Sequence, residues 1–179
     1  LSAASGGIVS SLLMFSLEQG IIDEALVVKM DKKNPLEARS IIARSKDEIL
    51  SAAQSKYLPV SFGETLKRII DGKKNFAVIG LPCQIHGIKK VAQKYPELKK
   101  RMKLSIGLFC LSNAPLATLF LLNKLGIDTG IVKELKYREG KWPGRVTIKM
   151  REGRTKFVDF RDFGWLLSLF SPLRCRLCI

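Results

Sequence analysis

The stretch NFAVIGLPCQIHG, residues 75–87, constrains the fold of this chain more than any other. Residues 76–79 form a short apolar run with the length and composition of a fully buried strand. A two-residue turn follows, and Pro82 suits the first position of a helix, where a missing N–H leaves no bond unmade. A buried strand that leads directly into a helix predicts an α/β fold, with Cys83 in the first helical turn.

The position of Cys83 admits two interpretations. Open α/β sheets bind ligands at the edge where their parallel strands end, and the N-terminus of a helix favours a thiolate over a thiol. Cysteine is also a small apolar residue that packs well between a helix and a sheet. The position alone leaves open both a functional thiol and a core side chain.

Apolar periodicity along the chain predicts a mixed sheet flanked by helices, followed by an antiparallel β segment in the C-terminal third. Strands are expected at residues 25–28, 38–43, 76–79, 102–108, 132–138, 145–150 and 156–160, and helices at residues 8–17, 45–54, 61–70, 82–94 and 115–125. The change from alternating helices and strands to successive antiparallel strands divides the chain into an α/β core over residues 1–130 and a C-terminal part over residues 131–179.

The chain is strongly basic, with 31 Lys and Arg against 16 Asp and Glu in 179 residues and a formal charge of +15. Such a balance suits polyanionic ligands, nucleic acid or an acidic protein partner. The basic runs, of which residues 99–103 are typical, have no interleaved aromatic residues and match no nucleic-acid-binding motif. We therefore expect a solvated basic face and no nucleic-acid partner.

The sequence also indicates the cellular compartment. No apolar run reaches the roughly 18 residues that cross a bilayer, and no basic segment precedes the first apolar helix as in a signal peptide. Four cysteines without a secretory signal are typical of the reducing cytoplasm, where they serve metal or redox chemistry. Because the sequence opens on Leu1 and stops at Ile179, we expect a fragment of a longer cytoplasmic protein without a membrane span.

The four cysteines form a candidate metal-binding set. Cys175 and Cys178 are spaced as Cys-x-x-Cys, which lets two thiolates reach one centre from a tight turn. Cys110 follows the strand expected at residues 102–108, and it approaches Cys83 if the two strands are neighbours. Four thiolates can hold Zn²⁺ or a [4Fe–4S] cluster. Zinc ribbons usually carry two Cys-x-x-Cys turns, so two single cysteines favour the cluster without excluding zinc.

Two other stretches are weaker signals for ligand binding. Ser5, Gly6 and Gly7 precede the first helix, and such a start lets a phosphate approach exposed N–H groups. An ordinary capped core helix explains that pattern equally well. Lys56 and Tyr57 place a cation beside an aromatic ring in a loop, which surface packing also explains.

Several segments together resemble the beta subunit family of coenzyme F420-reducing hydrogenases and F420H2 dehydrogenases. They are SGGIVSSLLMFSLEQGIID, SKYLPVSFGETL, VIGLPCQIHGIKK, GLFC, WPGR and PLRCRLC, in that order along the chain. Relatives of that family include F420-oxidising parts of sulfite reductases and plant-type chlorophyll reductases. The resemblance covers nearly the whole chain, and its GLPCQ and Cys-x-x-Cys segments are the most specific.

The resemblance implies an enzyme subunit that carries FAD and a [4Fe–4S] cluster. Such a subunit transfers a hydride between coenzyme F420 and the flavin, and passes single electrons to other redox subunits or a ferredoxin. Hydride transfer needs no nucleophile from the protein, so we expect no catalytic triad, and His86 is the only histidine. The basic excess suits the polyanionic tail of coenzyme F420 or an acidic ferredoxin.

The resemblance also assigns residues. The implied cluster ligands are Cys83, Cys110, Cys175 and Cys178. The implied FAD-binding residues are Ser5, Gly6, Gly7 and Ile8 for the pyrophosphate, with Lys56, Tyr57, Pro59, Gly80, Pro82 and Gln84 around the flavin. In the family, an Asp and a glycine-rich stretch follow the terminal cysteine pair and help to hold the flavin. This chain lacks them, so the fragment alone is expected to hold its cofactors poorly.

Two other functions stay open. One is a reductase of the same fold that acts on another substrate, such as a tetrapyrrole. The other is a zinc-stabilised basic module that binds nucleic acid. Flavin and iron–sulfur absorption in the full-length protein would separate both enzymes from the zinc module.

Overall fold

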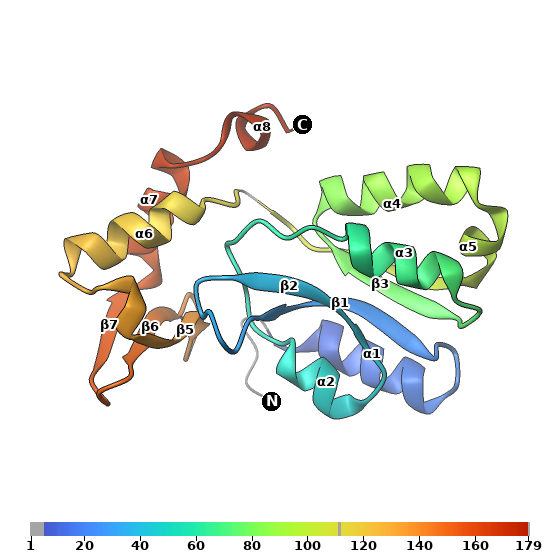
Figure 1. Cartoon of the computed structure of the whole chain (residues 1–179), viewed down its shortest axis with the longest axis horizontal. Helices are drawn as coiled ribbons and strands as arrows, with labels where there is room; N and C mark the ends of the chain where they lie inside the picture. The colour runs from blue at the N-terminus through green and yellow to red at the C-terminus, as the bar shows by residue number, and fades with distance from the viewer. Residues whose placement is uncertain (1–5, 111, 179) are drawn as a thin grey trace.

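The structure is a computed structural model that describes residues 6–110 and 112–178. The chain forms two bodies, each built around its own sheet (Figure 1). No helix within the described ranges is long and apolar enough to span a membrane.

The first body contains a four-stranded sheet in the order β2-β1-β3-β4. Its strands are β1 (Glu24–Met30), β2 (Ala38–Ala43), β3 (Phe76–Gly80) and β4 (Met102–Gly107). Strands β1, β3 and β4 are parallel to one another, and β2 is antiparallel to β1. Every residue of β3 is buried, as its uninterrupted apolar sequence predicts for a central parallel strand.

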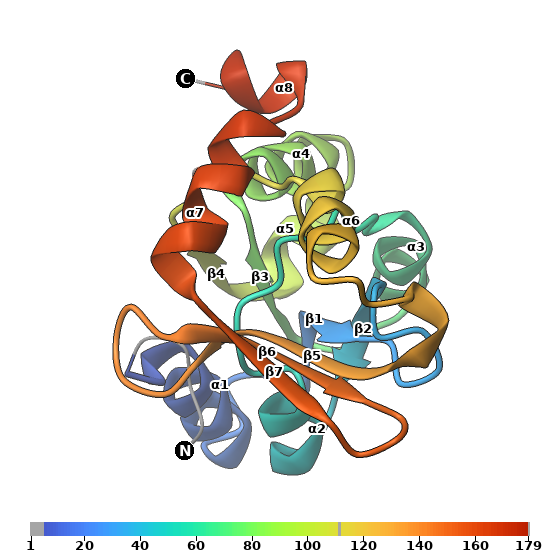
Figure 2. The same ribbon diagram turned by 90° about the vertical axis from the view of Figure 1, so that its left-hand side faces the viewer.

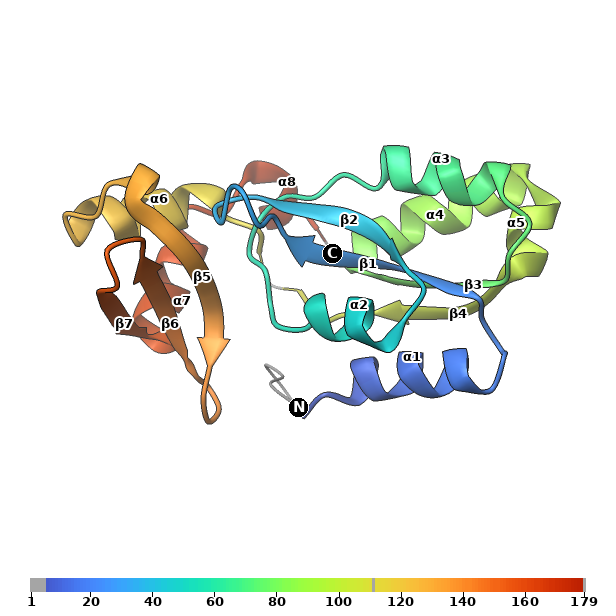
Figure 3. The same cartoon turned by 60° about the horizontal axis from the view of Figure 1, so that its bottom comes forward.

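Helices cover both faces of this sheet (Figure 3). On one face lie α1 (Ile8–Glu18) and α2 (Lys46–Ser51), and on the other lie α3 (Gly63–Asp71), α4 (Pro82–Lys94) and α5 (Pro96–Arg101). Side chains alternate between the faces along each strand. The two resulting clusters of buried apolar residues therefore share the strands β1 and β3.

The second body contains the antiparallel sheet β5-β6-β7 with two helices against it (Figure 2). Its strands are β5 (Val132–Glu139), β6 (Arg145–Met150) and β7 (Thr155–Asp159), and its helices are α6 (Pro115–Lys124) and α7 (Phe160–Leu169). One apolar cluster joins the helices α6 and α7 to this sheet. The short helices η1 (Thr129–Ile131) and α8 (Leu173–Arg176) complete the described chain.

The predicted mixed sheet flanked by helices and the added antiparallel segment are confirmed. The expected helix start at Ser45 is also found, since the Ser45 hydroxyl accepts from the Glu48 N–H at 3.3 Å. The Glu48 carboxylate reaches back one residue further than a capping box requires and accepts from the Arg44 N–H at 2.6 Å. The proposed division at residue 131 stays a prediction.

Three local expectations were wrong. The strand expected to run to residue 108 ends at Gly107, so Cys110 lies in the following loop. The N-cap of α1 is Gly7, which makes no side-chain cap bond; the serine expected there, Ser5, lies outside the described residues. The helix expected over residues 45–54 ends at Ser51, and Gln54 already has a φ of 79°.

Candidate functional site

The candidate site lies at the edge of the first sheet where β3 and β4 end. The register pairs Gly80 with Gly107, which brings the C-terminal ends of both strands side by side. Cys83 lies in the first turn of α4, directly after β3, and Cys110 lies in the loop after β4. The two single cysteines therefore come from neighbouring parallel strands, as expected.

A hydrogen bond brings the Cys-x-x-Cys pair to the same edge. The Ser112 hydroxyl donates to the Ser171 hydroxyl at 2.9 Å, joining the loop after β4 to the connection between α7 and α8. Cys175 lies on α8, and Cys178 follows it. Helix α8 accordingly lies near the N-terminal end of α4 in both Figure 1 and Figure 2.

The electrostatics of Cys110 reflect this convergence. Burial raises the pKa of the Cys110 thiol, and the negative charges of Cys175, Cys83 and Cys178 raise it further. All four thiols are free, and three of them are exposed while Cys175 is half-buried. Thiolates that repel one another are in turn stabilised by a shared cation, which is the chemistry of a metal centre.

The spacing of these thiols is wider than a closed metal site needs. Within residues 6–110 and 112–178, no group of three His, Cys, Asp or Glu side chains is placed to hold a metal ion. The donor set nevertheless suits zinc or an iron–sulfur cluster in kind and in number, because both take four thiolates. The metal-ligand assignment of the four cysteines stays a prediction.

The start of α1 is a pair of glycines, of which Gly6 is exposed and Gly7 is buried. Gly6 and Gly7 adopt φ values of 67° and 80°, a left-handed conformation that glycine accepts without strain. Ile8, the first helical residue, is 65% exposed, and no side chain caps the helix. The first N–H groups of α1 thus have no side-chain cap among the described residues, and uncapped N–H groups at a helix start are the kind that bind an anion.

Lys56 is half-buried and packs against its own chain. Its ammonium group donates to the carbonyl oxygens of Ala53 and Gln54, each at 2.7 Å, and to that of Ala52. Burial lowers the pKa of Lys56 to about 7, while the three carbonyl oxygens favour the charged form. Lys56 thus holds the end of α2 and the beginning of the next loop.

Tyr57 is part of the aromatic core of the second body. Its ring centroid lies 5.4 Å from that of Tyr137, 5.5 Å from Phe160 and 6.0 Å from Phe163. Burial raises the pKa of its hydroxyl. The loop after α2 therefore crosses from the first body to the second and passes the candidate site between them.

The residues around the β3–α4 turn form one packed unit. The Gln84 side chain accepts from the Leu81 N–H at 2.9 Å and donates to the Val60 carbonyl at 3.0 Å. A Cβ on Gly80 would lie only 3.2 Å from Gln84 and from the Phe62 ring. Gly80 and Gln84 thus hold the 56–60 loop against the turn, where Pro59 and Pro82 are exposed.

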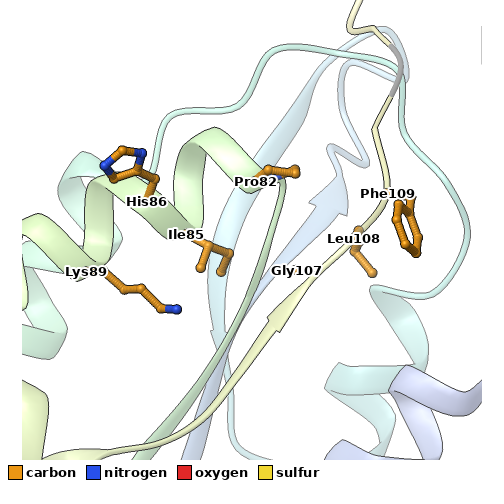
Figure 4. A pocket seen from close by; sticks show the side chains of 7 residues that line it. All are labelled: Pro82, Ile85, His86, Lys89, Gly107, Leu108 and Phe109. Atoms are coloured by element: carbon orange, nitrogen blue, oxygen red, sulfur yellow. The ribbon is translucent and has the colours of Figure 1, made fainter. Parts of the chain in front are cut away.

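An open groove of about 410 Å³ lies beside this turn, between α4 and the end of β4. Its lining is mainly apolar and consists of Pro82, Ile85, His86, Lys89, Gly107, Leu108 and Phe109. Figure 4 shows Ile85 and Lys89 on the helix side, with Leu108 and Phe109 on the strand side. Sequence reasoning missed this groove, although Phe109 directly precedes Cys110.

Comparison with known proteins identifies the family. Residues 2–67 match the N-terminal model of the coenzyme F420 hydrogenase/dehydrogenase beta subunit, and residues 73–179 match the C-terminal model. The chain belongs to this family. The resemblance inferred from the sequence motifs is thereby confirmed.

Several family relatives are similar along most of the chain. The coenzyme F420 hydrogenase subunit beta of Methanothermobacter thermautotrophicus is 32% identical over 148 residues, which are 78% of this chain and 52% of the relative. The coenzyme F420-dependent sulfite reductase of Methanocaldococcus jannaschii is 28% identical over 179 residues, covering 91% of this chain and 27% of the relative. The chain spans about half the length, or less, of these curated relatives.

A solved structure shares the fold. A chain of the F420-reducing [NiFe] hydrogenase complex from Methanosarcina barkeri superimposes with a TM-score of 0.71 at 23% identity. The match covers 99% of this chain and 60% of that chain. The two-body architecture described above is therefore the family fold.

Proposed function

We propose that this chain is part of an F420-dependent oxidoreductase subunit. In this proposal a hydride passes between coenzyme F420 and FAD, and single electrons leave through one [4Fe–4S] cluster to another redox subunit or a ferredoxin. The observation that supports the proposal is that Cys83 and Cys110 follow neighbouring parallel strands, while the Ser112–Ser171 hydrogen bond joins the loop after Cys110 to the segment before Cys175. The four free thiols suit a reducing compartment, and we propose the cytoplasm.

The chain supplies binding groups for both proposed cofactors. Cys83, Cys110, Cys175 and Cys178 would hold the cluster. Ser5, Gly6, Gly7 and Ile8 would bind the FAD pyrophosphate through the α1 N-terminus, where backbone N–H groups and the helix dipole favour an anion. Bound FAD supplies the conversion of a two-electron hydride into single electrons.

The remaining proposed residues shape the flavin site. We propose that Lys56, Tyr57, Pro59, Gly80, Pro82 and Gln84 border the flavin. Lys56 and Tyr57 fix the two ends of the loop that carries Pro59, through carbonyl hydrogen bonds and aromatic packing. Gln84 ties the same loop to the start of α4. These contacts would orient the flavin and exclude water from one side of it.

Absorption spectroscopy of the anaerobically purified full-length protein tests the proposal. We expect flavin bands with a broad iron–sulfur shoulder, and bleaching of the flavin when reduced coenzyme F420 is added in a stopped-flow mixer. Cys83→Ser should remove the shoulder and keep the flavin. A colourless protein with one zinc would contradict the proposal in favour of the zinc module. A flavin that stays oxidised would remove the F420 assignment and favour another substrate.

A further inference from the structure

Large apolar side chains are exposed on the segments that carry the cysteines. Phe109, directly before Cys110, is completely exposed. Leu173 and Leu177, on either side of Cys175, are 71% and 69% exposed. A single exposed leucine is ordinary in a folded protein, but several large apolar residues gathered about one candidate site mark a surface that contacts another molecule.

The same segments carry only positive charge. Residues 82–94, 102–127 and 163–178 contain no Asp and no Glu. Their charged side chains are Lys89, Lys90, Lys94, Lys103, Lys124, Arg174 and Arg176.

The antiparallel sheet provides the contrast. There Lys136 and Lys149 both pair with Glu134, and Arg161 pairs with Asp159. No ion pair between described side chains involves Lys89 or Arg174. Lys89 and Arg174 are thus not neutralised by an ion pair with a described acidic side chain.

The groove between α4 and β4 lies within this surface. Its apolar lining includes Ile85, Leu108 and Phe109, and Lys89 brings a cation to it. The groove is lined by Pro82 and Phe109, which directly precede Cys83 and Cys110 in the sequence, and not by these cysteines themselves. Its size and lining suit an apolar side chain from a docking partner.

We propose that this surface docks an acidic electron-transfer protein, which buries an apolar contact in the groove and pairs its carboxylates with the surrounding Lys and Arg. This inference rests on the proposed function, because the partner would exchange electrons with the group held by the four cysteines. An apolar centre with a charged rim is the usual anatomy of a transient protein interface. Opposite charge on the two partners speeds and orients their encounter.

Association measurements with the full-length protein test this docking surface. The probe is an acidic ferredoxin with two [4Fe–4S] clusters, and its dissociation constant is measured by calorimetry at low and high salt. Phe109→Ala and Lys89→Glu remove the apolar and the charged contact without changing a proposed ligand. Phe15→Ala, which truncates a 55% exposed ring on α1, and Lys133→Glu on β5 are the matched controls.

We expect Phe109→Ala and Lys89→Glu each to weaken ferredoxin binding about ten-fold, as for a central interface residue. Both controls should stay within about two-fold of the wild type, since exposed side chains outside an interface contribute little. Salt should weaken wild-type binding and affect Lys89→Glu less. In both variants the flavin should still bleach with reduced coenzyme F420 at the wild-type rate.

Four outcomes would overturn the docking proposal. The first is that both variants bind ferredoxin with wild-type affinity. The second is that a basic cytochrome c binds as tightly as ferredoxin, and the third is that duplex DNA displaces ferredoxin at equal charge concentration. The fourth is that the full-length protein does not bind ferredoxin. The last would mean that another part of the longer protein, or a second copy, covers the surface. Failure of the proposed function is distinguishable, because it appears as a missing cluster or an unbleached flavin whatever the ferredoxin does.

Discussion

The hydroxyl of Ser112 donates to the hydroxyl of Ser171 at 2.9 Å and so joins two loops that lie 59 residues apart in sequence. Ser112 is only 7% exposed. Each loop leads to a part of the cysteine set, the first from Cys110 and the second to Cys175. This bond is therefore positioned to hold the two halves of the candidate metal centre together.

Replacing Ser112 by Ala should disturb the arrangement of the four cysteines more than it lowers the stability of the fold. We expect the free energy of unfolding to fall by about 1 kcal/mol, the usual contribution of one hydrogen bond. Iron should be lost to a chelator faster than from the wild type, as followed by the decay of the iron–sulfur absorption. Ser168→Ala is the control, since the Ser168 hydroxyl donates to the Gly164 carbonyl within its own helix α7. Equal iron release from both variants would contradict this role.

Gly80→Ala should destabilise the β3–α4 turn. The new methyl group would lie 3.2 Å from Gln84 and from Phe62, so the side chain that holds the 56–60 loop has to move. We expect a loss of about 1–3 kcal/mol in urea unfolding. Gly87→Ala in the middle of α4 meets nothing within 4 Å and should instead add about 0.5–1 kcal/mol. A Gly80→Ala variant as stable as the wild type would be inconsistent with the close packing.

The buried pair Thr118–Tyr137 provides a test of the second body. Their hydroxyl groups lie 3.0 Å apart, and Tyr137 is fully buried. Thr118→Val leaves the tyrosine hydroxyl without this partner, so we expect a loss of about 1–3 kcal/mol. Tyr137→Phe should cost about 0.5–1.5 kcal/mol. The double variant should be more stable than the sum of both losses predicts, and strict additivity would show that the bond contributes nothing.

Lys56 should make stability depend on pH. Burial lowers its pKa to about 7 from the usual 10.5, so the unfolded chain binds more protons than the folded protein between these values. The free energy of unfolding should therefore rise with pH in this window. We expect a gain of about 1 kcal/mol between pH 7 and pH 9, because the carbonyl bonds to the ammonium oppose the effect of burial.

Lys56→Met isolates this contribution, because it removes the Lys56 ammonium group and leaves every other ionisable group in the chain. At pH 7 the variant should be less stable than the wild type, because the carbonyl groups of Ala52, Ala53 and Gln54 lose the bonds that they accept from Lys56. Its free energy of unfolding should also rise less between pH 7 and pH 9, because the contribution of Lys56 is missing. Lys133→Met, which removes an exposed lysine, is the control. Parallel stability–pH curves for the wild type and Lys56→Met would show that Lys56 keeps an ordinary pKa.

The parts of the fold that local composition determines were predictable from the sequence. Strand β3 and the start of α4 follow from an apolar run, a turn and Pro82, and the structure has both. The three antiparallel strands follow from alternation and turn residues in the same way. In each case the side chains that decide the element lie within it.

Features that depend on contacts between distant segments were not predictable. The sequence places Tyr57 in a loop, and the resemblance places it near the flavin, but neither predicts that it packs against Tyr137 and Phe163 of the second body. The Ser112–Ser171 bond joins two residues that carry no sequence signal of their own. The groove beside Phe109 likewise exists only because α4 and the end of β4 face each other. Such contacts follow from tertiary packing, which overrides local propensity.

The four thiols come from two different parts of the fold. Cys83 and Cys110 follow strands of the first sheet, whereas Cys175 and Cys178 lie beyond the antiparallel sheet, on and after α8, which lies near the start of α4. A metal centre bound by all four thiolates would close a long loop of the chain and crosslink the two bodies. Loss of such a centre would remove one crosslink between the two bodies and leave the packing of Tyr57 against Tyr137 as a remaining contact between them.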